Sequence, residues 1–324
     1  MVETKNLNEN KIIAQELEND LIVSSSPHIF SKDTTSKIML DVLIALLPAT
    51  IASVIIFGLQ AFILVCTASA VLAEWGFQAL CKQKITISDL SAAVTGLLLA
   101  LNLPASVTWW QAIIGSVIAV VVVKGLFGGI GKNFANPAIT ARIILLLAFS
   151  ASVGAAVQPV IVDATSTATP LTILKLDYGI LPSLFEMMIG LRGGAIGETC
   201  SLALILGGVY LMIRKVITWH TPVIFVGCVF LFTLILNGSL EFALYEVLSG
   251  GLLIGAIFMA TDYSTTPSRA WGKVIFAVGC AIITVAIRMW GSYPEGVSFA
   301  ILFMNILTPY IDKLTRKRPF GGVR

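Results

Sequence analysis

The chain has 324 residues, of which 57% are hydrophobic and only 12% are charged, and its mean hydropathy is +0.92. Because a soluble globular domain carries about 25% charged residues, this composition excludes an ordinary soluble enzyme and leaves no room for a large soluble domain. The net charge of +3 hides an asymmetry along the chain, and the whole pattern indicates a polytopic membrane protein.

Residues 1–36 form the first expected segment. They hold six acids and three bases, so this segment is net −3 and the rest of the chain is net +6. They contain no apolar stretch of the kind that signal peptides carry. We therefore expect a solvated cytoplasmic arm that is helical in part.

Ten apolar runs of 16 to 22 residues follow the arm. A helix that crosses a bilayer takes about 20 apolar residues, and the ends of these runs are expectations. The runs are 37–58, 60–80, 88–103, 110–130, 134–154, 198–213, 221–236, 242–261, 272–290 and 297–312. Lys and Arg gather in alternate connections, and the connections between those carry none, except that the long segment 155–197 holds Lys175 and Arg192. The positive-inside rule therefore predicts that both termini are cytoplasmic and that 155–197 lies outside.

The two halves of the chain resemble each other. Residues 95–110 (TGLLLALNLPASVTWW) and 250–271 (GGLLIGAIFMATDYSTTPSRAW) share a Gly-Leu-Leu start, a polar break, a proline and a tryptophan. Two halves of five spans each must be inverted relative to one another because the number is odd. We expect an all-α fold with one repeat at 37–154, an outer loop at 155–197, a second repeat at 198–312 and a basic cytoplasmic tail at 313–324. Chance similarity of two Leu- and Gly-rich helices is the alternative.

Residues 128–142 read GGIGKNFANPAITAR, between the fourth and fifth runs. The glycines free the backbone, and Asn136-Pro137 can start a helix whose N–H groups favour an anion. Lys132 and Arg142 add positive charge. The alternative is a tight cytoplasmic turn with an inside-positive anchor.

Charges stand inside predicted spans, among them Glu74 in the second, Lys124 in the fourth and Glu246 in the eighth, of which Glu74 and Lys124 are the main candidates. A charge at the bilayer centre costs a few kcal/mol, so these residues are candidates for ion or cofactor handling. Snorkelling, a buried pair and contact with another subunit are the alternatives. The five cysteines lack ligand spacing and there are only two histidines, so we expect no metal site.

Residues 163–172 read DATSTATPLT, in the predicted outer loop. From composition alone this is a Ser/Thr-rich loop that caps a short helix after Pro170. The pattern Asp163-x-x-Ser166-x-Ala168-Thr169, however, resembles the D-x-x-[ST]-G-A-T signature, on which a flavin transferase attaches FMN through a phosphoester to the final threonine. Where the signature has glycine this chain has Thr167, which makes Thr167 the alternative site. Thr169 matches the spacing from the acid.

Three further stretches resemble the same family. They are Ser25-Ser26-Pro27-His28, the loop from Gly128 to Ala138, and Ala260-Thr261-Asp262-Tyr263-Ser264-Thr265-Thr266-Pro267. From about residue 24 the chain is similar to the D subunit of the Rnf complex, a family that is itself similar to the B subunit of the sodium-pumping NADH:quinone reductase. The resemblance implies a ten-span, inverted-repeat fold like that of urea transporters, in a bacterial or archaeal plasma membrane.

The resemblance also implies a function. The chain would be an electron-transfer subunit of a translocase that moves electrons from reduced ferredoxin to NAD⁺ and exports Na⁺ or H⁺; which ion is moved stays open. It would carry covalent FMN on Thr169, with Arg192 or Lys175 pairing with the phosphate. A non-covalent flavin, riboflavin in related subunits, would lie in the span bundle, and the residues proposed to wall it are Lys132, Asn133, Asn136 and Arg142.

The expected partners are the other membrane, flavoprotein and iron–sulfur subunits, and a flavin transferase for maturation. Ferredoxin and NAD must bind to partners, since no strand–GxGxxG–helix unit is visible here, and no nucleic-acid partner is expected. Two other functions compete with this one. A flavin-free solute channel or transporter fits the same fold, and a purely structural scaffold would bind no flavin and carry no flux.

Overall fold

The computed structural model describes residues 33–58, 61–154, 169–176, 181–198 and 200–316, and these residues form helices and connections without a strand. One isolated antiparallel bridge joins Pro104 and Ala195. The helices up to residue 153 are α2 (Thr35–Phe57), α3 (Ala61–Leu80), η1 (Ile87–Asp89), α4 (Ser91–Leu101), α5 (Trp109–Val117), η2 (Ile118–Gly125), α6 (Pro137–Ala148) and α7 (Ser150–Val153). The later ones are α8 (Pro170–Leu176), α9 (Leu184–Ile189), α10 (Ser201–Ile213), α11 (His220–Asn237), α12 (Leu240–Leu248), α13 (Leu252–Ile254), η3 (Gly255–Met259), α14 (Ala270–Trp290) and α15 (Val297–Leu314).

Five helices are long and apolar enough to cross a membrane: α2, α3, α11, α14 and α15. A sixth candidate is the pair formed by α12 with α13–η3, which is bent by 63°. Four further apolar helices are shorter, namely α4, α5 with η2, α6 and α10. The predicted all-helical class is therefore confirmed for the described residues, and the count of ten crossings stays a prediction.

The short helices result from breaks in the apolar runs. At about 1.5 Å per residue, the 11 residues of α4 span about 16 Å, roughly half of the hydrocarbon core. Leu90, in a left-handed conformation with φ of 63°, separates α4 from η1. Gly250 and Gly251, with φ of 67° and 66°, separate α12 from α13. Glycine adopts this conformation without steric cost, whereas leucine does not.

These breaks revise one detail of the sequence comparison. Gly96 lies inside α4, whereas Gly251 precedes α13, so the two Gly-Leu-Leu stretches do not occupy equivalent positions. The left-handed residue before each helix, Leu90 or Gly251, is the feature that α4 and α13 share.

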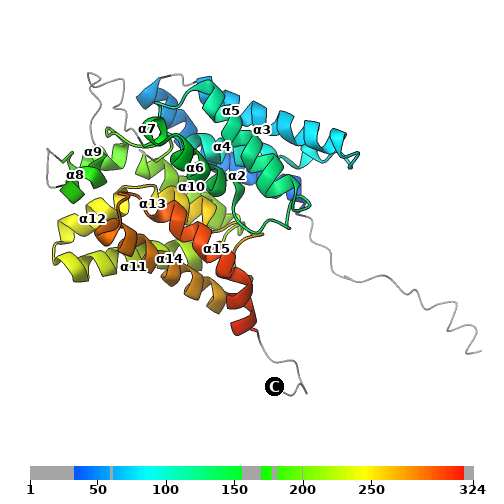
Figure 1. The fold of residues 1–324 in the computed structure, drawn as a ribbon. Helices are drawn as coiled ribbons and strands as arrows, with labels where there is room; N and C mark the ends of the chain where they lie inside the picture. Colours follow the sequence, from blue (N-terminus) through cyan, green and yellow to red (C-terminus); the bar gives the residue numbers. More distant parts are fainter. Residues whose placement is uncertain (1–32, 59–60, 155–168, 177–180, 199, 317–324) are drawn as a thin grey trace, which may run out of the picture. The chain divides into compact units, whose positions relative to one another are not determined.

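The helices pack in corresponding pairs (Figure 1). α3 contacts α4 and α5, and α11 contacts α12 and α14 in the same way. Between the halves, α2 packs on α10 and α6 packs on α15. Two glycines permit close approach: a Cβ at Gly207 would collide with the Ala45 carbonyl of α2, and one at Gly96 would lie 2.8 Å from Ala70 Cβ of α3. Small residues serve the same purpose between membrane helices in general.

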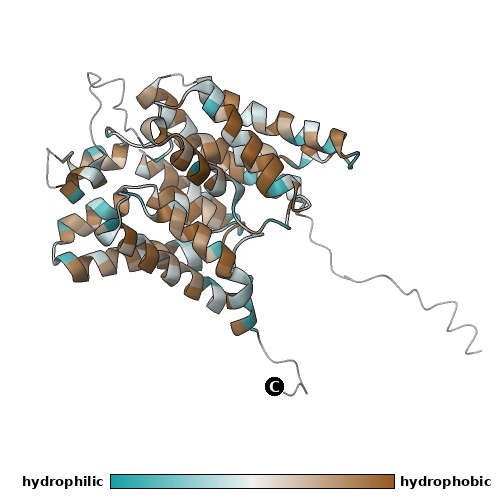
Figure 2. Ribbon diagram, viewed as in Figure 1, coloured by the Kyte–Doolittle hydropathy of each residue, from teal (hydrophilic) through white to brown (hydrophobic). Residues whose placement is uncertain are grey.

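The outer surface of the bundle is largely apolar, as Figure 2 shows along the long helices. Leu47, Ile55 and Ile235 are exposed large hydrophobic side chains at their centres or ends. Trp109, Trp219 and Trp290 are also exposed, each at the end of a helix, where interfacial anchors are expected. The chain divides into two compact units, Met1–Thr34 and Thr35–Arg324, and nearly all the described residues belong to the second.

Candidate functional site

Thr169 lies within the predicted outer segment 155–197 and is the first residue that the structure describes after residues 155–168. It precedes α8, and its Oγ1 accepts a hydrogen bond from the Thr172 N–H at 3.2 Å, as an N-cap does. The same oxygen lies 2.8 Å from Thr172 Oγ1. The hydroxyl therefore stands at the start of a helix in a fixed orientation. The other residues of the motif, Asp163, Ser166 and Ala168, and the alternative Thr167, lie outside the described residues.

Helix α8 is anchored at both of its ends. Leu171 is buried, and a Cβ at Gly250 would collide with its Cδ1, so α8 lies directly over the break between α12 and α13. Lys175 donates to the carbonyl oxygens of Gly291 and, at 3.3 Å, Tyr293. The ammonium group thus ties α8 to the connection between α14 and α15. Its predicted role as a phosphate partner stays a prediction.

Three arginines and three glutamates lie close together near the break between α12 and α13, and we call them the Arg–Glu cluster. Its members are Arg142 on α6, Arg192 and Glu198 between α9 and α10, Glu246 on α12, Arg288 on α14, and Glu295 between α14 and α15. All except Glu295 are buried. Each such charge is costly in a membrane protein unless it is paired, so the cluster is a candidate functional site.

One ion pair of this cluster, Arg288 with Glu246, lies at the break at Gly250. Arg288 Nη1 lies 2.6 Å from Glu246 Oε2 and also donates to the Glu246 main-chain carbonyl. Arg288 Nη2 donates to the carbonyl of Ser249 at 3.0 Å. The guanidinium thereby satisfies carbonyl groups that the end of α12 leaves without helical partners.

The predicted role of Arg192 as a phosphate partner suggests an exposed side chain in a loop. In the structure Arg192 is buried instead. Its side chain is only 3% exposed, Nη2 donates to the Glu198 carbonyl at 2.9 Å, and Nη1 lies 3.7 Å from Met187 Sδ. Burial lowers the pKa of Arg192, while Glu198 and Glu295 act in the opposite direction. Its Nε is buried without a hydrogen-bond partner among the described groups.

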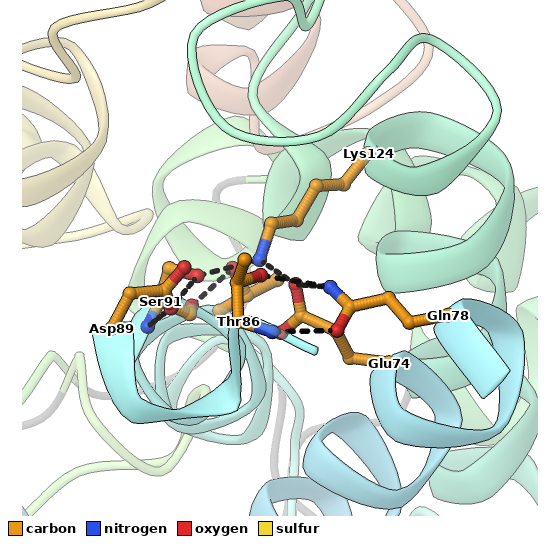
Figure 3. Close-up of polar contacts among 7 residues, drawn as sticks. Glu74, Gln78, Thr86, Asp89, Ser91 and Lys124 are labelled. Atoms are coloured by element: carbon orange, nitrogen blue, oxygen red, sulfur yellow. Dashed lines mark hydrogen bonds and ion pairs between the residues drawn. The ribbon is translucent and has the colours of Figure 1, made fainter. Parts of the chain in front are cut away.

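Lys124 and Glu74 form a second buried pair, near the break at Leu90 (Figure 3). Lys124 Nζ lies 2.6 Å from Glu74 Oε1 and 2.5 Å from Ser91 Oγ, and it points toward both. Asp89 accepts from both the N–H and the hydroxyl of Ser91. Of the alternatives for these two residues, the structure selects the buried pair. Whether ions use it stays a prediction.

The loop 128–138 and the stretch 261–264 line one cavity of about 100 Å³, together with α4 and the start of α2. Asn133 and Asn136 border it, and the buried Oδ1 of Asn133 has no hydrogen-bond partner among the described groups. Lys132 is not among the lining residues. Arg142 lies elsewhere, paired with Glu295 and donating to Ser298 Oγ at 2.8 Å. Of the four residues predicted to wall a second flavin, the structure thus brings two together.

Asp262 also borders this cavity, just beyond the end of η3. Its Oδ2 accepts from the hydroxyls of Ser264 at 3.0 Å and Thr265 at 3.1 Å. Burial raises the pKa of Asp262, and these hydrogen bonds act in the opposite direction. The cavity therefore offers an amide and a carboxyl group within apolar walls, which is the usual character of a small-molecule site.

Sequence reasoning did not identify Arg288, Glu198 or Glu295. Arg288 could have been found, because it is a charge inside an apolar run and such charges are costly. Glu198 begins a predicted run and looked like an ordinary boundary residue. Its burial depends on the bridge between residues 195–197 and the end of α4, where Gly197 N–H donates to the Leu101 carbonyl at 2.8 Å.

Comparison with known proteins identifies the family. A model of the NQR2, RnfD, RnfE family matches residues 22–321. The D subunit of the Na⁺-translocating ferredoxin:NAD⁺ oxidoreductase complex of Acetobacterium woodii is 44% identical, over 94% of this chain and 96% of that protein. The D subunit of the proton-translocating complex of Clostridium ljungdahlii is 40% identical, over 96% and 99%.

The D subunit of an ion-translocating oxidoreductase complex from Stutzerimonas stutzeri is 36% identical, over 90% of this chain and 93% of that protein. These relatives are all named as subunits of multi-subunit, ion-translocating oxidoreductases. Because the match extends over nearly the whole length on both sides, the chain belongs to the NQR2, RnfD, RnfE family.

Proposed function

We propose that this chain is the membrane electron-transfer subunit of an ion-translocating ferredoxin:NAD⁺ oxidoreductase complex, and that it carries FMN on Thr169 through a phosphoester. The observation that carries the proposal is the flavinylation pattern ending at Thr169, in a chain with full-length relatives of that name. The remaining subunits of the complex and a flavin transferase are its partners.

The surroundings of Thr169 fit this attachment. The hydroxyl is the nucleophile that a phosphoester requires, and it is half-buried at a helix start rather than enclosed in the core. Leu171 and Lys175 hold α8 against the bundle, so a group esterified to Thr169 would be tethered at a defined place. FMN supplies the redox chemistry, and the chain supplies its position and electrostatic surroundings.

A second flavin, not covalently bound, is proposed for the cavity that Asn133 and Asn136 border. The cavity of about 100 Å³ is smaller than the roughly 300–1,000 Å³ usual for small-molecule sites, so binding a flavin requires the surrounding side chains to move apart. The unpartnered Asn133 Oδ1 could accept from a ring N–H of a riboflavin. Lys132 and Arg142 do not support this proposal, since neither borders the cavity.

We also propose ten crossings in two inverted repeats, with both termini in the cytoplasm. Support comes from the matching helix contacts of the two halves and from the left-handed break that precedes α4 and α13. The coupling ion is left as Na⁺ or H⁺, because relatives of similar identity are named for different ions.

The test is direct. The chain is expressed with and without a flavin transferase, and a denaturing gel is examined for flavin fluorescence. Wild type is expected to fluoresce only with the transferase, Thr169→Val to be dark, and the control Ser183→Ala, which removes a hydroxyl at the start of α9, to stay fluorescent. If fluorescence is lost in Thr167→Val but retained in Thr169→Val, the flavin is attached to Thr167 instead of Thr169. A dark wild type with an active transferase would favour a flavin-free transporter.

A further inference from the structure

Glu198 differs from the other two glutamates of the Arg–Glu cluster. Glu246 pairs with Arg288, and Glu295 pairs with Arg142. Glu198 is also buried, but no cation lies within ion-pairing distance of its carboxylate among the described residues. Its Oε2 has no hydrogen-bond partner there, and the nearby Arg192 donates to the main-chain carbonyl of Glu198 instead.

A buried carboxylate in this state is costly as an anion, and binding a cation relieves the cost. A metal ion would need several oxygen ligands. Here the neighbouring charged groups include the guanidinium groups of Arg142 and Arg192, which offer no acceptor and repel a metal cation. A proton needs only the carboxylate itself.

We propose that Glu198 is a proton-binding group that exchanges protons with the outer solution along the space beside Gly251, next to the pair of Arg142 and Glu295. In the exchange, a proton leaves hydronium and bonds to a Glu198 carboxylate oxygen, giving a neutral carboxyl group and water. On release the same bond breaks. No oxidant or reductant takes part.

The geometry supplies the route. Glu295 is the outermost member, with a side chain 25% exposed, and it pairs with Arg142. Arg142 Nη1 and Glu198 Oε2 border the same space beside Gly251, each 3.7 Å from where a Cβ on that glycine would lie. Gly251 leaves this space free because it has no side chain. The partly exposed Glu295, its partner Arg142 and the space beside Gly251 thus lead from the surface to the buried carboxylate.

Electrostatics agree with a proton. Glu198 lies between α9 and α10, outside the spanning helices, and burial raises its pKa. The neighbouring Glu295 carboxylate raises the pKa further, while Arg192, Arg142 and the Gly251 N–H act in the opposite direction. Arg288 of α14 is a neighbouring charge of Arg192, and its guanidinium pairs with Glu246.

The proposed function gives this site a purpose, since α8 with Thr169 lies over Gly250, next to Gly251. A proton bound there would place a compensating charge near the proposed flavin anchor. The site itself does not depend on the flavin, so it is tested on the full chain made without a flavin transferase. A failed flavinylation gel and a failed proton test are therefore separate results.

The experiment is infrared difference spectroscopy of the purified full chain during pH steps. Wild type is expected to show a buried carboxyl group that stays protonated above the usual pKa of about 4.3 for Glu. Glu198→Gln, which resembles the protonated group in shape, should lose this signal. The matched control Glu241→Gln removes an exposed acid of α12 and should keep it.

Glu295→Gln provides a second and independent measurement. Removing its negative charge should shift the Glu198 titration to lower pH by roughly one unit. The proposal is overturned if Glu198→Gln leaves every titrating carboxyl signal in place. Should that variant fail to fold, an unshifted titration in Glu295→Gln overturns it as well.

Discussion

At the scale of single residues, the energetics centre on buried charges. Lys124 pairs with Glu74 and contacts Ser91 Oγ inside the bundle, and Arg288 pairs with Glu246 near Gly250. Each cation lies beside a break in the helix path, at Leu90 or at Gly250. The pairs therefore stabilise backbone that has left helical geometry, whatever further role they have in ion movement.

Lys124→Met tests this at the first pair. It leaves the Glu74 carboxylate buried without a cation, so we expect a loss of about 3–5 kcal/mol in stability. The double variant Lys124→Met/Glu74→Met should recover most of that loss, because it removes both charges. Thermal unfolding of the detergent-purified full chain measures both. Lys84→Met, an exposed lysine on the α3–η1 connection, is the control and should change stability by less than about 0.5 kcal/mol. A double variant no more stable than the single one would contradict the pairing.

The sequence indicated Lys124 and Glu74 as candidate residues but did not indicate Glu198, and the difference has a physical reason. Lys124 and Glu74 stand out because charge is rare in apolar runs. The sequence does not reveal that the two residues form a pair, because 50 residues separate them and only the packing of α3 on η2 brings them together. Glu198 was missed since a carboxylate at the edge of a run is normally solvated. Its burial depends on a backbone contact with α4 that no local pattern encodes.

At the scale of helices, the apolar runs predicted from the sequence correspond to helices of the structure, but the positions at which those helices are interrupted were predicted less accurately. The run 88–103 contains α4, and the run 242–261 contains most of α12 together with α13 and η3. Hydropathy does not reveal that the second is bent at Ser249–Gly251, because those residues are small and do not interrupt the apolar pattern. The polar stretch at 260–263, which suggested the interruption, instead follows the end of η3.

Gly207→Ala tests the contact between α2 and α10. The added methyl group would meet the Ala45 carbonyl, so the helices must separate, and we expect a loss of about 1–3 kcal/mol. Gly227→Ala is the matched control, since it adds the same group to α11 with nothing within 4 Å. That change should be neutral or stabilising by about 0.5–1 kcal/mol. Equal melting temperatures for the two variants would show that the α2–α10 contact is looser than described.

At the scale of the whole molecule, the helix contacts bear on the proposed inverted repeat. The pairs α2–α10 and α6–α15 join equivalent helices of the two halves, and each half uses its second span, α3 or α11, as the helix that contacts the third and fourth. The proposed two-fold relation in the membrane plane would produce this pattern. It would also place equivalent connections of the two repeats on opposite sides of the membrane.

Labelling with a membrane-impermeant maleimide tests that placement. Cys81 is exposed on the connection after α3, which the positive-inside rule assigns to the cytoplasm. Ser239 is exposed on the equivalent connection after α11. Ser239→Cys, made in a Cys81→Ala background, should be labelled in intact cells, whereas native Cys81 should be labelled only after lysis. Lysed cells provide the control for reactivity at both positions. Labelling of both residues, or of neither, in intact cells would mean that the two connections share a side, and the halves would then be parallel rather than inverted.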